Sequence, residues 1–114
     1  MGFSANANAQ QSTAIGALAR STEQASVSVG YSSQATGNRA VSIGSDTLSA
    51  GTYSISIGSN VVGGNVTRAT QENSIAIGAG AQSTFSRAVA IGAGAQTTNS
   101  NQIVLGTESD TVYI

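Results

Sequence analysis

Hydrophobic and small residues alternate in short segments along this chain, and each segment ends at a glycine. The clearest segment runs from Ser74 to Gly78, where isoleucine alternates with serine or alanine. The same pattern ends at seven glycines, separated by 14, 14, 14, 20, 14 and 14 residues: Gly16, Gly30, Gly44, Gly58, Gly78, Gly92 and Gly106. A fixed short period predicts a β-solenoid, in which each repeat forms one coil of a continuous stack. We expect the periodic glycines to be structural, at positions that need a positive φ or a close approach between coils.

Each 14-residue unit contains two segments with the two-residue alternation of a β-strand. The first segment comes just before the glycine. Its residues at the third and the first position before the glycine are aliphatic in 13 of 14 cases, and the residue between these two positions is mostly alanine or serine. A second segment of small residues follows the glycine. The pattern predicts two strands of about five residues and two tight turns per coil, around a thin core of Val, Ile, Ala and Ser. Because a solvent-facing strand face normally carries charged residues, we expect the uncharged small face to meet a partner chain.

The repeats divide the chain into three parts. Residues 1–11 are expected to form a partial first coil or an N-terminal segment, residues 12–106 the repeats, and residues 107–114 a terminal strand leading to a cap or a further domain. The single 20-residue spacing indicates an insertion within residues 59–73, which is expected to leave the stack as a loop. The residues proposed for this candidate binding or clasp loop are Val61, Val62, Asn65, Thr67 and Arg68.

Composition argues against catalysis and against a nucleic-acid partner. The chain has no His and no Cys, which excludes Ser-His-Asp and Cys-His nucleophilic arrangements. Its formal net charge of −1 leaves no basic footprint for nucleic acid. Among the five acidic residues only Glu108 and Asp110 are close in sequence, in an expected solvated turn with too few oxygen donors for a cation site. We therefore predict no enzyme activity, no cofactor and no bound metal.

A column of threonines has a separate interpretation. Thr22, Thr36, Thr84 and Thr98 each lie six residues after a glycine, and Ala50 interrupts the series. A regular threonine array on a solenoid could order water, as ice-binding proteins do. Two such columns would be expected for that function, and the sequence shows one.

The repeated unit resembles the head repeat of trimeric autotransporter adhesins, the YadA-like family of Gram-negative surface proteins. The segment from Asn73 to Gly78, followed by Ala81 and Ser83, is close to that family's motif. The resemblance covers roughly residues 12–106, with seven copies in phase. It implies an all-β fold, a left-handed parallel β-roll, assembled as a homotrimer.

The same resemblance implies a virulence-associated adhesin on the cell surface, anchored in the outer membrane in its full-length form. Its head would bind an extracellular matrix or cell-surface ligand multivalently, without inserting into the membrane itself. An alternative remains open, because the ending from Asn101 to Ile114 also resembles repeat ends in viral fibre proteins. In that case the chain would be a trimeric fibre segment of a phage or large virus, with a structural role on the virion.

Overall fold

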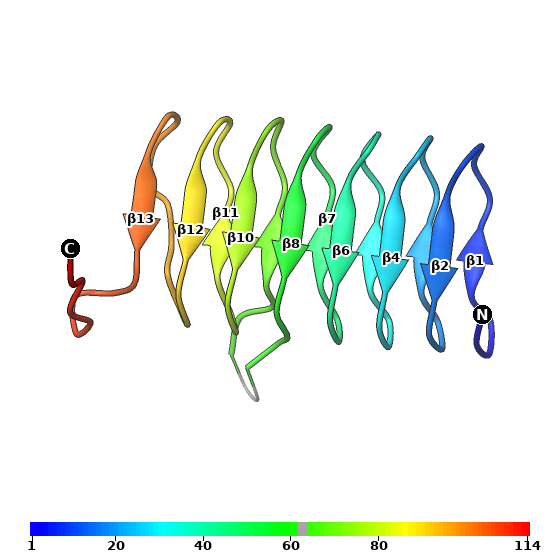
Figure 1. Ribbon diagram of the computed structural model, residues 1–114, viewed down its shortest axis with the longest axis horizontal. Helices are drawn as coiled ribbons and strands as arrows, with labels where there is room; N and C mark the ends of the chain where they lie inside the picture. The colour runs from blue at the N-terminus through cyan, green and yellow to red at the C-terminus, as the bar shows by residue number, and fades with distance from the viewer. Residues whose placement is uncertain (62–63) are drawn as a thin grey trace.

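The computed structural model is a β-solenoid of stacked coils (Figure 1). It describes residues 1–61 and 64–114. Within these ranges there is no helix and every pairing between strands is parallel. The longest dimension of the molecule is 40 Å. The predicted all-β solenoid of 14-residue coils is confirmed.

Two parallel sheets run along the stack, and each of the coils from residue 13 to residue 83 contributes one strand to each sheet. The front sheet of Figure 1 contains the strands that end at the periodic glycines: β2 (Thr13–Ile15), β4 (Val27–Val29), β6 (Val41–Ile43), β8 (Ile55–Ile57), β10 (Ile75–Ile77), β12 (Val89–Ile91) and β13 (Ile103–Leu105). The back sheet contains β1 (Asn6–Ala7), β3 (Arg20–Ser21), β5 (Gln34–Ala35), β7 (Leu48–Ser49), β9 (Arg68–Ala69) and β11 (Gln82–Ser83). The prediction of five-residue strands is wrong, because each coil must turn twice within 14 residues and the turns take most of them.

The two ends of the chain differ. Residues near the N-terminus form a coil, since β1 pairs in register with β3 and Gly2 has a φ of 123°, as the later glycines do. At the other end, residues 111–114 are not in a strand, so the predicted terminal strand is wrong. After β13 the chain makes a turn and leaves the stack (Figure 1), which takes these residues away from the strand they would have to pair with.

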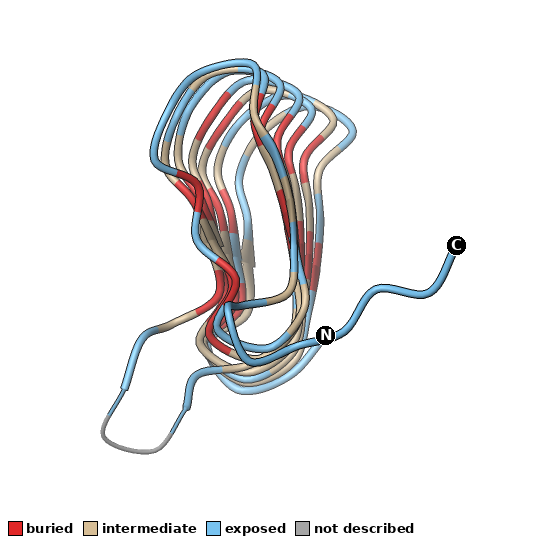
Figure 2. Cartoon of the chain, turned by 90° about the vertical axis from the view of Figure 1, so that its left-hand side faces the viewer, coloured by how far each residue is buried: buried red, intermediate tan, exposed pale blue. Residues whose placement is uncertain are grey.

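Small side chains fill the interior of the roll, and the Val and Ile side chains that flank them in the front strands lie outside it, whereas Val104 packs against the inner alanines. In β4, Ser28 is buried between Val27 and Val29, which are only partly buried. Figure 2 shows the buried positions recurring at the same places in successive coils. The expectations that Val and Ile join the core and that the small face meets a partner are therefore wrong. A coil of 14 residues has room for side chains no larger than threonine or valine, so alanine, serine and threonine point inward and the larger residues point outward.

Buried hydroxyl groups are paired across this interior. Oγ of Ser28 lies 2.7 Å from Oγ of Ser33, and Oγ of Ser49 lies 2.7 Å from Oγ of Ser54. A buried hydroxyl without a partner destabilises the folded state, so the pairing allows serine to replace an apolar residue. Towards the C-terminal end alanines form a cluster in the interior, Ala69, Ala76, Ala81, Ala90 and Ala95, alongside buried Ser74 and Ser83.

The coils approach each other closely at the periodic glycines. All seven have a positive φ, between 77° and 156°. A Cβ atom on Gly16 would lie 2.6 Å from the carbonyl oxygen of Gly30 in the next coil. The positive φ and the lack of room for a Cβ atom against the next coil thus both require glycine in this column.

Other corners use left-handed residues that are not glycine. Eleven described non-glycine residues have φ between 54° and 61°, and from Ser4 to Tyr53 they recur every seven residues. Each coil in this part of the chain therefore has two such left-handed corners, one in each turn, and Gly80 and Gly94 take the same conformation in later coils. Residues such as Leu18 and Ala25 occupy this conformation at a cost of about 1–2 kcal/mol each.

Candidate interaction surfaces

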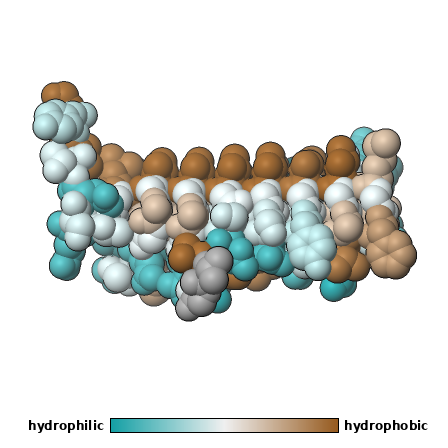
Figure 3. All heavy atoms as spheres, turned by 90° about the horizontal axis from the view of Figure 1, so that it is seen from below, coloured by the Kyte–Doolittle hydropathy of each residue, from teal (hydrophilic) through white to brown (hydrophobic). Residues whose placement is uncertain are grey.

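The outer surface of the front sheet is a continuous aliphatic stripe. It consists of the first and last residues of β2, β4, β6, β8, β10, β12 and β13, and all except Thr13 are Val, Ile or Leu. Parallel register aligns them, so that Val41 lies opposite Ile55 and Ile43 opposite Ile57. Figure 3 shows the stripe as a hydrophobic row along the whole upper edge of the view.

The stripe is incompletely covered in the single chain. The side chains of Ile15, Ile43, Ile57 and Ile91 are 36–42% exposed. Burying the remainder of one such side chain would contribute roughly 1 kcal/mol, which amounts to about 10 kcal/mol for the 13 aliphatic positions. An apolar face of this length and regularity marks an interaction surface.

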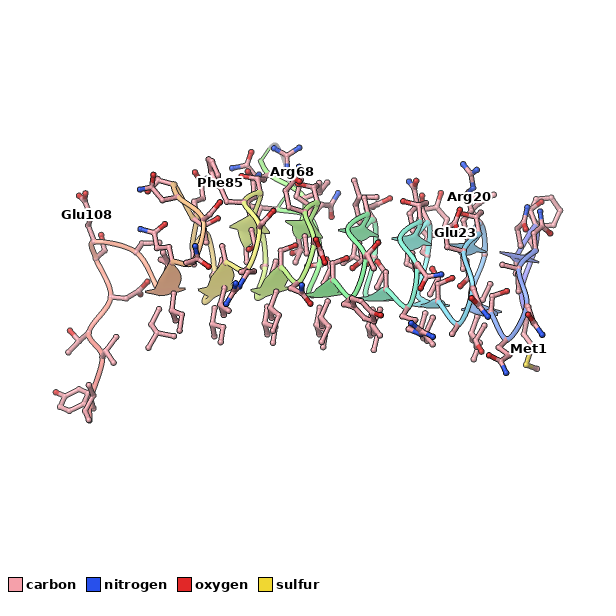
Figure 4. The ribbon with its side chains drawn as sticks, turned by 90° about the horizontal axis from the view of Figure 1, so that it is seen from above. Met1, Arg20, Glu23, Arg68, Phe85 and Glu108 are labelled. Carbon is pink, nitrogen blue, oxygen red and sulfur yellow. The ribbon has the colours of Figure 1, made fainter. Side chains whose placement is uncertain are left out.

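The C-terminal segment extends on the same side of the roll as the stripe. Figure 4 shows the tail running towards the side on which the rows of aliphatic side chains stand. Val112 and Tyr113 in this segment are exposed. The tail therefore extends the apolar surface beyond the last coil.

The insertion leaves the roll on the opposite side. Figure 2 shows the loop projecting from the lower turn, away from the front sheet. Leu48 pairs with Arg68 and Ser49 with Ala69, so the regular coil has resumed by residue 67. The six extra residues are therefore 61–66, and the predicted span of 59–73 is too wide.

Thr67 fixes the base of this loop. Its side chain is fully buried, and its Oγ1 lies 2.7 Å from the carbonyl oxygens of Ser59 and Gly78. The amide of Gly80 donates to the same Oγ1 at 3.0 Å. One hydroxyl therefore connects Ser59, which lies just before the insertion, to the coil that follows it.

The residues predicted for the loop fall into different environments. Val61 and Asn65 lie in the exposed part, joined by a hydrogen bond of 3.2 Å from the Val61 amide to the Asn65 carbonyl. Val62 lies outside the described residues. Thr67 is buried and cannot contact a ligand, and Arg68 is in β9, where it donates to Oε1 of Gln82 at 3.3 Å. The prediction that all five form one surface is wrong for Thr67 and Arg68.

The outer face of the back sheet is polar. The threonine column runs along it and gains Thr70, because Ala69 pairs with Ser83 and brings Thr70 level with Thr84. The neighbouring column contains Arg and Gln in place of a second set of threonines. This face thus lacks the double threonine array that ordering of water would need.

The acidic side chains are dispersed over the described residues. Among them, no three His, Cys, Asp or Glu side chains come together as a metal site would require. An open hollow of about 550 Å³ at the C-terminal end is lined by Val104, Leu105 and their neighbours, with Glu108 as its only acidic residue.

The predicted turn at Asp110 is present. The carboxylate of Asp110 accepts one hydrogen bond from the Thr107 amide at 2.6 Å and another from the Thr107 hydroxyl at 2.9 Å. These bonds lower the pKa of Asp110, as expected when hydrogen bonds favour the charged form.

None of the described residues lies in a helix that could cross a lipid bilayer.

Comparison with known proteins agrees with the repeat geometry. The family model for the YadA head domain repeat matches residues 1–19, 21–47, 40–60 and 69–95, and so leaves out the insertion. The collagen-binding domain of the Yersinia adhesin YadA is a similar solved structure, with 24% identity and a TM-score of 0.45 over 96% of this chain and 74% of that domain. This structural likeness is too distant to add to the family match. No curated protein matches the chain. Since the family model covers most of the coils, the chain belongs to the family of YadA head-domain repeats.

Proposed function

We propose that this chain is the adhesive head module of a trimeric cell-surface adhesin. The observation that carries the proposal is the aliphatic stripe, which runs in register along the whole front sheet and is only partly covered in one chain. Other copies of the chain would cover this stripe. Three rolls with their front sheets towards a common axis would bury it, and the choice of three rests on family membership.

This arrangement would turn the back sheet and the insertion outward. The insertion projects away from the front sheet (Figure 2), which supports a role in recognition more than a role in clasping a neighbour. Loops held by a rigid scaffold commonly carry binding residues. Three copies would give avidity for a repetitive ligand, such as extracellular matrix or another cell surface, even when each contact is weak.

The stripe is tested by a charge placed in its centre. The double variant Ile43→Lys with Ile57→Lys is expected to abolish the trimer, because two lysines from each chain would have to be buried together. Leu48→Lys, on the back sheet between these coils, is the matched control and is expected to remain trimeric. Light scattering measures the mass of each variant, and a trimeric double variant would contradict the proposal.

The insertion is tested by deleting residues 61–66, which restores the 14-residue period. A variant that stays trimeric but no longer attaches to matrix-coated surfaces supports recognition by the loop. Loss of the trimer would instead identify the loop as a clasp. Unchanged assembly and attachment would show that the insertion is neutral.

A further inference from the structure

The outer face of the back sheet, called the back face below, carries two straight columns of side chains. One column follows the strand register from Arg20 to Gln34, Leu48, Arg68, Gln82 and Gln96. The other lies two residues further on, with the same outward orientation, and contains Thr22, Thr36, Ala50, Thr70, Thr84 and Thr98. Neighbouring coils are about 4.8 Å apart and the columns about 7 Å apart. The back face is therefore a narrow grid of guanidinium, amide and hydroxyl groups, interrupted by Leu48 and Ala50 in one coil.

Charge on the back face has one sign. Arg20 and Arg68 are its only charged residues, because the five acidic residues of the chain lie in turns or in the C-terminal tail. Figure 4 shows both arginines on the side opposite the aliphatic rows, and Arg20 points away from the roll, whereas Glu23 lies closer to it. Between the two arginines lie the uncharged positions of Gln34 and Leu48. The spacing is thus one cation for every three coils, or about 14 Å.

This chemistry favours one class of ligand. Amides and hydroxyls both donate and accept hydrogen bonds, as sugar hydroxyls do, and guanidinium pairs with carboxylate in a bidentate geometry. The wide spacing of the arginines suits a chain with sparse carboxylates and many hydroxyls better than a densely sulfated one. A single-stranded nucleic acid would need aromatic groups on which its bases could stack, and neither column contains an aromatic residue.

We propose that the back face binds an extended uronic-acid polysaccharide, with Arg20 and Arg68 pairing to carboxylates and the Gln and Thr columns binding the hydroxyls between them. In the proposed trimer three such faces point outward. The inference deepens the proposed function and rests on it for avidity.

Binding to immobilised hyaluronan oligosaccharides tests this proposal, with the trimeric chain in solution. The variant Arg20→Gln with Arg68→Gln replaces each arginine by the residue type of its column neighbours, so the fold should be unaffected. It is expected to bind at least about tenfold more weakly, because it loses two charge-assisted contacts per chain. The matched control, Arg39→Gln with Arg87→Gln, changes the net charge equally at the exposed turns and is expected to bind as the parent does.

The possible results separate this proposal from the proposed function. A trimer that attaches to matrix proteins but binds no hyaluronan would overturn this proposal alone, whereas a monomeric chain would overturn the proposed function. Equal loss in the two double variants would show that binding follows net charge and would also overturn the proposal. So would tighter binding of heparin, or equal binding of uncharged chitin oligosaccharides.

Discussion

The glycine column makes a quantitative prediction at Gly78. Its φ is 126°, and a Cβ atom would lie 2.7 Å from the carbonyl carbon and oxygen of Gly92 in the next coil. Alanine at this position combines backbone strain of about 1–3 kcal/mol with overpacking of about 1–3 kcal/mol. We expect Gly78→Ala to destabilise the chain by about 2–6 kcal/mol.

Gly94 provides a matched control in the equivalent turn of the next coil. Its φ is 72°, and the nearest atom to a Cβ there would be Cγ2 of Thr107 at 3.7 Å. Alanine at this position meets only the left-handed backbone penalty of about 1–2 kcal/mol, offset in part by the lower entropy of the unfolded chain. The control should therefore lose about 1 kcal/mol.

Thermal unfolding followed by circular dichroism distinguishes the two variants. A change of 1 kcal/mol shifts Tm by about 4 °C for a chain of this size, so Gly78→Ala should melt at least 8 °C below the parent and Gly94→Ala about 4 °C below it. All chains must be compared at one concentration, because assembly makes Tm depend on concentration. Equal Tm values for the two variants would refute the reasoning about close approach between coils.

Three further predictions concern hydrogen bonds. Thr67→Val should lower the free energy of unfolding by about 1–3 kcal/mol, whereas Thr70→Val on the back face should change it little. Denaturant unfolding measures both variants, and equal effects would contradict the role of Thr67 at the base of the insertion. Ser54→Ala should destabilise because it leaves the buried Ser49 hydroxyl without its partner, and adding Ser49→Ala should recover most of the loss. The folded pKa of Asp110 is lowered, so its turn is stabilised above the ordinary pKa of a carboxyl group and loses that contribution as pH falls through the folded pKa. The amide resonance of Thr107 should follow this titration, and an invariant resonance would contradict it.

The solenoid and its period could be predicted from the sequence because the same three features recur in every coil. Alternation, a terminal glycine and a fixed spacing reinforce one another over seven copies. The assignment of inside and outside could not be obtained in the same way, since neither strand face carries charge. The usual rule places Val27 and Val29 inside, but the narrow coil admits only Ser28.

The candidate loop was predicted in length but not in position. A spacing of 20 residues shows that six are extra, and it does not show which six. Thr67 resembles a loop residue in sequence, yet strand register returns it to the coil. The left-handed corners at Leu18 and Ala25 carried no signal either, because neither residue type favours a positive φ.

The central claim is that the aliphatic stripe is buried between three copies of the chain. The most direct test is the solution mass of the purified parent chain, measured by light scattering from high to low micromolar concentration. The account predicts a constant mass of three times 11.2 kDa. A stable, folded monomer of 11.2 kDa at these concentrations would contradict it.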